Sequence, residues 1–150
     1  RAPSFNSVFH YSQMESLTPY LKLLIAESAK PLQSIETDFA VDSSGFSTST
    51  YVRWFDVKYG NNEDWHDWVK MHLMCGVKTH VVTSVEISRA TKHDSPYFIP
   101  LIEQTPEAGF TMREVSADKG YISAKNLQAT VDVGATPFIP FQVQYTAGSR

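Results

Sequence analysis

The sequence contains little cysteine, no excess of positive charge and no long hydrophobic run. One cysteine, Cys75, excludes an internal disulfide and any zinc site built from several cysteines. No apolar stretch approaches the roughly 20 residues of a membrane-spanning helix. We therefore expect no membrane partner and a cytoplasmic, intracellular location. The formal net charge of -3 lacks the basic excess that nucleic-acid-binding domains usually carry.

Several common catalytic motifs are also missing. The sequence has no glycine-rich phosphate loop of the nucleotide or dinucleotide kind and no Gly-x-Ser-x-Gly nucleophile elbow. His66 and His72 are not spaced as a metal-binding pair on one helix. What is present is ordinary for a soluble domain: 150 residues, of which 42% are hydrophobic and 19% charged. This length predicts a single domain with a real hydrophobic core.

The first 33 residues read as a lead-in followed by one helix. Apolar residues recur at helical spacing after Thr18-Pro19, and Pro31 ends the pattern. The helix face that we expect to pack against the core contains Leu17, Tyr20, Leu21, Leu24, Ile25 and Ser28. Residues 34–150 form the second predicted unit, which holds the remaining strands and helices.

Three consecutive strands are predicted next. The first runs from Phe39 to Asp42, and residues 51–57 have strand composition as well. Residues 69–75 and 80–88 alternate with a period of two and form a plausible antiparallel hairpin around a turn at 77–79. In the first arm we expect Val69, Met71, Leu73 and Cys75 on the core face and Lys70, His72 and Met74 on a polar face.

The second half alternates helix and strand. Asp94-Ser95-Pro96 is typical of a helix start, with Asp94 or Ser95 as the cap. A short strand ends at Asp118, Ser123 caps a second helix that stops near Gly134, and residues 137–141 form a last strand. Three strands followed by helix, strand, helix and strand predict an α/β fold with a mixed sheet and flanking helices.

Two strands are followed by an aspartate and a small-residue turn, at Asp42 and at Asp118. If the fold makes these strands neighbours, the two carboxylates come together, and a cation is needed to neutralise them. Magnesium takes oxygen ligands and keeps waters, which leaves room for a phosphate. The alternative is that both are turn residues without chemistry.

Four further residues are candidate DNA contacts near these aspartates. Lys70, His72 and Lys119 could meet phosphates, and Tyr121 could stack on or hydrogen-bond to DNA. Each has a structural alternative: the first three as the solvated face of a strand or turn, and Tyr121 as a packing residue against the sheet.

The order of these features resembles the catalytic domain of insertion-sequence DDE transposases. The likeness is carried by the Asp42 strand, residues 68–80, His93-Asp94 and Asp118-Lys-Gly-Tyr, and it covers about residues 35–141. It implies an RNase H-like fold that binds magnesium or manganese through Asp42 and Asp118. It also implies DNA partners, cleavage and joining at transposon ends, and a homo-oligomer in the active complex.

The third acidic residue departs from the family pattern. The family's glutamate follows the last core strand, whereas Glu103, Glu107 and Glu114 precede Asp118, and Asp132 falls on the intervening helix. We therefore expect either a piece of a transposase or a transposase-derived binding module without chemistry. A metal-dependent nuclease of the same fold is the remaining alternative.

Overall fold

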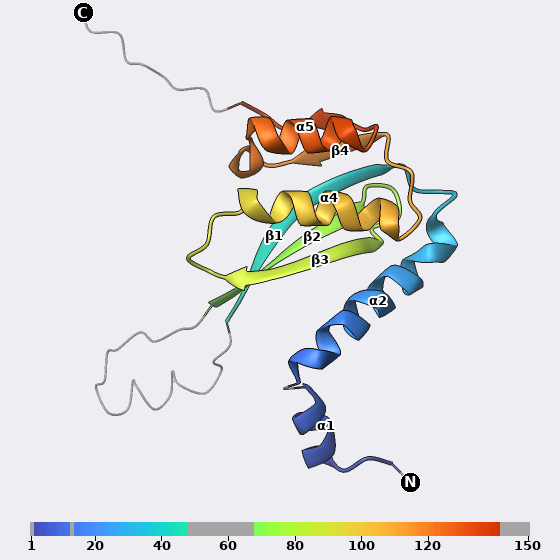
Figure 1. Ribbon diagram of the computed structural model, residues 1–150, viewed down its shortest axis with the longest axis vertical. Helices are drawn as coiled ribbons and strands as arrows, with labels where there is room; N and C mark the ends of the chain where they lie inside the picture. The colour runs from blue at the N-terminus through green and yellow to red at the C-terminus, as the bar shows by residue number, and fades with distance from the viewer. Residues whose placement is uncertain (1, 13, 48–67, 142–150) are drawn as a thin grey trace, which may run out of the picture.

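Five strands form one mixed sheet in the computed structural model, which describes residues 2–12, 14–47 and 68–141. The spatial order is β3-β2-β1-β4-β5 (Figure 1). Their bounds are β1 (Asp38–Ser47), β2 (Trp68–Gly76), β3 (Val82–Arg89), β4 (Glu114–Ala117) and β5 (Thr136–Phe138). β1, β2 and β3 pair antiparallel, whereas β4 pairs parallel with β1 and with β5. This arrangement confirms the predicted RNase H-like mixed sheet.

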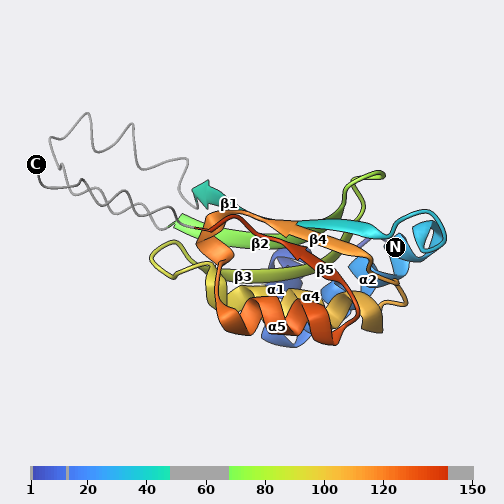
Figure 2. The ribbon, with the colours of Figure 1, turned by 90° about the horizontal axis from the view of Figure 1, so that it is seen from above.

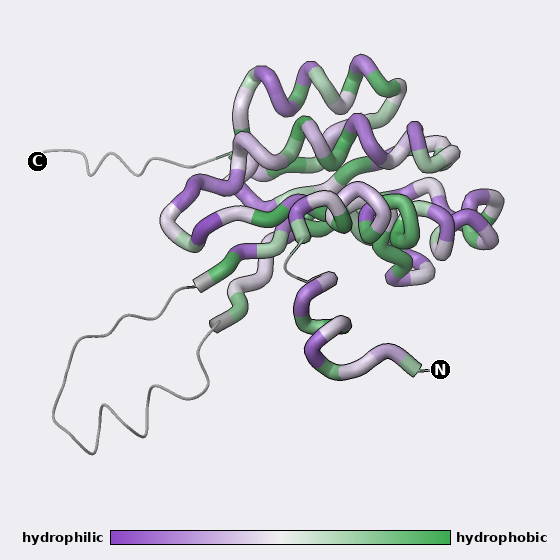
Figure 3. The backbone as a smooth tube through the Cα atoms, turned by 60° about the horizontal axis from the view of Figure 1, so that its bottom comes forward, coloured by the Kyte–Doolittle hydropathy of each residue, from purple (hydrophilic) through white to green (hydrophobic). Residues whose placement is uncertain are grey.

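Four α-helices accompany the sheet within the described residues: α1 (Phe5–Ser12), α2 (Thr18–Ala29), α4 (Phe98–Glu107) and α5 (Ala124–Asp132). α4 and α5 lie side by side against one face of the sheet (Figure 2). α2 packs along β3, and α1 extends beyond it (Figure 1). Hydrophilic and hydrophobic stretches alternate along α4 and α5 (Figure 3).

The boundaries of α5 follow the predicted capping chemistry. Ser123 Oγ accepts a hydrogen bond from the Asn126 N–H at 3.1 Å, as an N-cap residue does. The helix ends at Asp132, and Gly134 then takes a φ of 84°, a conformation that glycine adopts without steric cost. These two residues fix where the chain turns back to form β5.

The core lies between the sheet and the α4–α5 layer. Phe39, Val41, Met74 and Val115 point into it from three neighbouring strands and are buried. Residues of α4 and of the segment after β4 meet them from the other side: Phe98, Leu101, Ile102 and Tyr121. Burial of such large side chains contributes about 2 kcal/mol each, so this layer holds β1 and β4 in place.

The predicted core face of β2 is wrong. His72 and Met74, expected on the polar side, are fully buried, while Met71, Leu73 and Cys75 are only half-buried. The period-two pattern is correct, but the polar His72 is buried and finds its hydrogen-bond partners in Tyr121 and Ser88, so polarity did not mark the solvent side. In β3, Thr83 and Val85 are buried, whereas Ile87, two residues further along, is 64% exposed.

The predicted packing face of α2 is only partly correct. Tyr20, Leu21 and Leu24 are exposed, whereas Ile25, from the same predicted face, is half-buried. Ile25 and Ala26 lie toward β3 and α4, and Ala29 is buried. Lys22 pairs with Glu86 of β3. Because this helix carries apolar residues all round, spacing alone could not select its contact face.

Some predictions fall on residues outside the described ranges. These are the strand composition at 51–57 and the spacing of His66 from His72. The division of the chain at residues 33 and 34 stays a prediction. Among the helices that the structure describes, none is long and apolar enough to cross a membrane.

Candidate metal centre

Asp42 and Asp118 are positioned by the pairing of β1 with β4. The parallel register ends at Val41 opposite Ala117, so each aspartate is the next residue on its strand. Asp118 follows the end of β4, as predicted. Asp42 does not end its strand: β1 continues to Ser47 as a ribbon with β2, and Asp42 lies opposite Leu73. Because β4 stops first, the edge of β1 is open on the side that faces Asp118.

The two aspartates share one open pocket of about 510 Å³ on the sheet. Among the described residues, its lining comes from the middle of β1 and the end of β4: Ala40, Val41, Asp42, Ser116, Ala117 and Asp118. Asp42 and Asp118 are both exposed. The structure therefore brings together the two carboxylates that the sequence singled out.

Both carboxylates make the same local hydrogen bond. Asp42 Oδ1 accepts from the N–H of Ser43 at 2.7 Å, and Asp118 Oδ1 accepts from the N–H of Lys119 at 2.6 Å. Asp118 also begins the 3₁₀ turn Lys119–Tyr121. A carboxylate held through one oxygen keeps a defined orientation, which a ligand for a hard cation requires.

The donor set fits a magnesium-like ion. Such an ion takes oxygen ligands, uses one or two carboxylates and completes its shell with water and substrate phosphate. Across the described ranges, no group of three histidine, cysteine, aspartate or glutamate residues stands close enough to hold one ion. The pocket of Asp42 and Asp118 thus offers two protein ligands.

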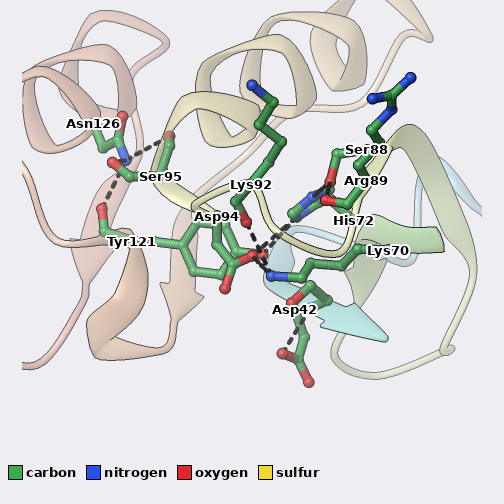
Figure 4. Close-up of polar contacts among 11 residues, drawn as sticks. Asp42, Lys70, His72, Ser88, Arg89, Lys92, Asp94, Ser95, Tyr121 and Asn126 are labelled. Atoms are coloured by element: carbon green, nitrogen blue, oxygen red, sulfur yellow. Dashed lines mark hydrogen bonds and ion pairs between the residues drawn. The ribbon is translucent and has the colours of Figure 1, made fainter. Parts of the chain in front are cut away.

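Tyr121 lies behind the pocket, among three aspartates. Burial raises the pKa of its hydroxyl to about 12, and the negative charges of Asp94, Asp42 and Asp118 add to the shift, while a hydrogen bond with Ser43 opposes it. Only 1% of Tyr121 is exposed. Figure 4 shows the Tyr121 ring directed toward His72.

Asp94 makes an ion pair that sequence analysis missed. As expected, the 3₁₀ turn Ser95–Tyr97 and then α4 follow it, but its side chain caps neither. Its Oδ1 instead accepts from Lys70 Nζ at 2.8 Å, and Lys70 also donates to the Lys92 carbonyl at 3.2 Å (Figure 4). The sequence alone gives no sign of this pair, because Lys70 lies in β2 and Asp94 precedes α4, and only the fold brings the two residues together.

The four predicted DNA contacts separate into two groups. His72 is fully buried and Tyr121 is nearly so. A DNA duplex at this surface would therefore touch neither side chain in this conformation. Tyr121 packs in the core, which was the structural alternative to a DNA contact. Lys119 is exposed beside Asp118. Lys70 is partly exposed, with its charge paired to Asp94.

Burial lowers the pKa of His72, and the charge of Lys70 acts in the same direction, against the carboxylates of Asp94 and Glu86. The imidazole is therefore neutral near pH 7. Its Nδ1 lies 3.2 Å from the Tyr121 hydroxyl and its Nε2 lies 3.0 Å from Ser88 Oγ. Tyr97 stacks on the ring, with a centroid distance of 4.4 Å. His72 is thus fully engaged inside the fold.

Comparison with known proteins finds a matching protein family and a similar solved structure. No protein of curated function matches the chain significantly. A chain in the cryo-EM structure of the simian T-cell lymphotropic virus intasome in complex with PP2A regulatory subunit B56 gamma is similar, with 15% identity and a TM-score of 0.46. The likeness covers 74% of this chain and spans only 36% of that one. Residues 33–147 match the transposase DDE domain, so the chain belongs to the transposase DDE domain family.

Proposed function

We propose that this chain is the catalytic core of a DNA transposase that cleaves and joins phosphodiester bonds at transposon ends. One observation carries the proposal. In a chain of the transposase DDE domain family, Asp42 and Asp118 line a single open pocket at adjoining strands. Both are the residues for which the sequence pattern suggested metal chemistry, and both are accessible.

In this proposal, Asp42 and Asp118 bind Mg²⁺ or Mn²⁺. A divalent ion there supplies an activated water or DNA hydroxyl and neutralises charge on the attacked phosphate. The chain's own contribution is orientation. The Ser43 and Lys119 amides hold one oxygen of each carboxylate, and the parallel pairing of β1 with β4 fixes their spacing. Water and a DNA phosphate would complete the shell around two protein ligands.

DNA is the proposed partner, and Lys119 is the proposed phosphate contact beside the pocket. It is exposed and directly follows Asp118. Lys70 would have to exchange Asp94 for a phosphate, because its ammonium group is already paired. With a net charge of -3 and so few cationic contacts, DNA binding by this chain should be weak. Homo-oligomer formation and an intracellular location stay predictions.

Calorimetric titration with Mn²⁺ tests the site. Asp42→Asn and Asp118→Asn should each weaken binding at least about tenfold. Asp132→Asn is the matched control: it removes the same charge from an exposed aspartate on α5, whose carboxylate contacts only Gln128 among the described residues. An equal loss of Mn²⁺ affinity in all three variants would mean that the change in net charge alone explains it. Unchanged Mn²⁺ affinity in Asp42→Asn or Asp118→Asn would remove that aspartate from the proposal.

Activity on transposon-end DNA separates the possible functions. Cleavage and joining that require a divalent ion and both aspartates would support a transposase. Cleavage without joining would support the nuclease alternative. Metal binding without either reaction would leave a DNA-binding or interaction module.

A further inference from the structure

The two ends of the sheet differ in what gathers there. β1, β3 and β4 all end at the side where α4 and α5 begin, and Asp118 lies at this end (Figure 1). The opposite end holds the turn between β2 and β3. Helix N-termini carry partial positive charge, so the end with Asp118 has a more favourable potential for an anion.

Exposed cations that lack an ion-pair partner follow the same division. Four of them lie at the end with Asp118, and a fifth lies in the turn between β2 and β3. Among the described residues these are Arg89, Lys92, Lys119 and Lys125 at the first end and Lys78 at the second. The net charge of -3 therefore conceals a local group of cations beside the candidate metal centre.

The turn after β3, residues 89–94, is held beside the end of β4. Lys70 Nζ donates to the Lys92 carbonyl at 3.2 Å and to Asp94 Oδ1 at 2.8 Å, which anchors this turn to β2 (Figure 4). On the other side, a Cβ at Gly120 would lie 3.7 Å from Asp94 Oδ2 and 4.0 Å from Asp118 Oδ2. The turn is thus contiguous with the residue that carries the second aspartate.

The backbone of this turn is fixed, while two of its side chains are free to bind an anion. The Arg89 carbonyl accepts from the Lys92 N–H at 3.0 Å and from the Ser88 hydroxyl at 3.2 Å. Figure 4 shows the charged ends of Arg89 and Lys92 extending away from the Lys70–Asp94 pair. Asp94 does not neutralise them, because its own charge is paired to Lys70. Cations on a fixed backbone can hold DNA phosphates in one register.

We propose that Arg89 and Lys92 bind phosphates of the DNA strand that the candidate metal centre acts on. The strand crosses the end of the sheet from Asp118, past Lys119, to the turn after β3. Lys70 contributes by anchoring that turn. This inference rests on the proposed function, because it names the surface that the DNA follows away from the pocket of Asp42 and Asp118.

The salt dependence of DNA binding tests this surface. Arg89→Gln and Lys92→Gln each remove one charge and leave the backbone hydrogen bonds of the turn in place. Lys78→Gln is the matched control, because it removes the same charge from an exposed, unpaired lysine at the opposite end of the sheet. The whole chain is titrated against a fluorescent DNA duplex between about 50 and 200 mM salt.

The slope of log affinity against log salt is the quantity compared. It should become less negative by about 0.9 in Arg89→Gln and in Lys92→Gln, because each variant loses one phosphate contact. The loss of affinity should be the same for duplexes of different sequence, since phosphate contacts do not read bases. Lys78→Gln should keep the wild-type slope. An unchanged slope in both site variants would overturn the proposal.

Cross-linking distinguishes a direct contact from a general change in the electrostatic field. Cys75 is the only cysteine of the sequence, so Cys75→Ser provides a background without thiols. In that background, Lys92→Cys should react with DNA that carries a mixed disulfide tethered to its backbone: the thiolate attacks the tether and releases the small thiol. Lys78→Cys should not react at the same DNA concentration. Equal reaction at both positions would refute the surface.

The two proposals fail in different ways. If Mn²⁺ binding requires Asp42 and Asp118 but the salt slope does not depend on Arg89 and Lys92, the metal site stands and the DNA surface is refuted. If both cations are needed for DNA binding but the wild type does not bind Mn²⁺, the phosphate contacts stand and the catalytic function is refuted. An equal change of slope in Lys78→Gln, or no measurable DNA binding by the wild type at low salt, refutes the surface.

Discussion

Replacing Glu36 should produce a large loss of stability without touching the candidate metal centre. Glu36 is 1% exposed, and one of its oxygens, Oε2, accepts three hydrogen bonds from the turn between β2 and β3. The donors are the Lys78 N–H at 3.1 Å, the Thr79 N–H at 2.8 Å and the Thr79 hydroxyl at 2.9 Å. This carboxylate is what closes the hairpin whose first strand pairs with β1.

The magnitude follows from these three contacts. In Glu36→Ala, water can reach the turn because Lys78 is exposed and Thr79 is half-buried. Each lost bond should therefore cost about 1 kcal/mol, at the lower end of the range for charged partners, and the total should be about 3 kcal/mol. Glu36→Gln keeps an acceptor oxygen and loses only the charge, so it should cost about 1 kcal/mol.

Urea denaturation monitored by circular dichroism measures these differences, with Glu103→Ala, an exposed glutamate on α4, as the control. The control should change the free energy of unfolding by less than about 0.5 kcal/mol. A Glu36→Ala variant as stable as the control would refute the role of this carboxylate in the turn. Mn²⁺ affinity should be unchanged in all three variants at low urea.

Three further predictions concern stability. Gly76→Ala should destabilise the fold by about 2 kcal/mol in urea denaturation, because its Cβ would lie 2.4 Å from the buried Glu36 side chain; stability within 0.5 kcal/mol of wild type would contradict this contact. Burial lowers the pKa of His72 from 6.5, so the unfolded chain binds more protons and stability should fall as the pH decreases below about 6.5. Urea midpoints at pH 7.5 and 5.5 should show this fall, and His72→Gln should reduce it; an equal fall in the variant would assign it to other groups. Ser123→Ala should cost about 1 kcal/mol through loss of the α5 cap, and an unchanged melting temperature would contradict that cap.

Local chemistry explains why much of the fold could be predicted. Ser123 and Gly134 act within their own turns, so their effect on α5 is readable from neighbouring residues. The alternation in β2 and β3 likewise depends only on the period of a strand. The predicted succession of helix, strand, helix and strand in the second half matches α4, β4, α5 and β5, because each element depends on the periodicity and capping of its own residues.

What could not be predicted depends on contacts between distant residues. The contact face of α2 is decided by β3 and Glu86, 64 residues away from its partner Lys22. The buried face of β2 is decided by Tyr121 and Ser88, which satisfy His72. A polar residue on a period-two strand is compatible with solvent or with a partner inside, and the sequence does not say which.

The candidate site shows the same division. The two aspartates were visible because a carboxylate after an apolar strand is unusual in itself. The pairing of Asp94 with Lys70 and the hydrogen bond between Tyr121 and His72 were not visible, because each joins segments that only the folded sheet brings into contact. The buried positions of His72 and Tyr121 follow from the same long-range contacts.

The most direct test is a crystal of this chain soaked in manganese and measured by anomalous diffraction. We predict a peak within coordination distance, about 2.2 Å, of carboxylate oxygens from both Asp42 and Asp118, and its disappearance from crystals of Asp118→Asn. A peak bound elsewhere, or a pocket that stays empty at millimolar manganese while both carboxylates keep their places, would contradict the account.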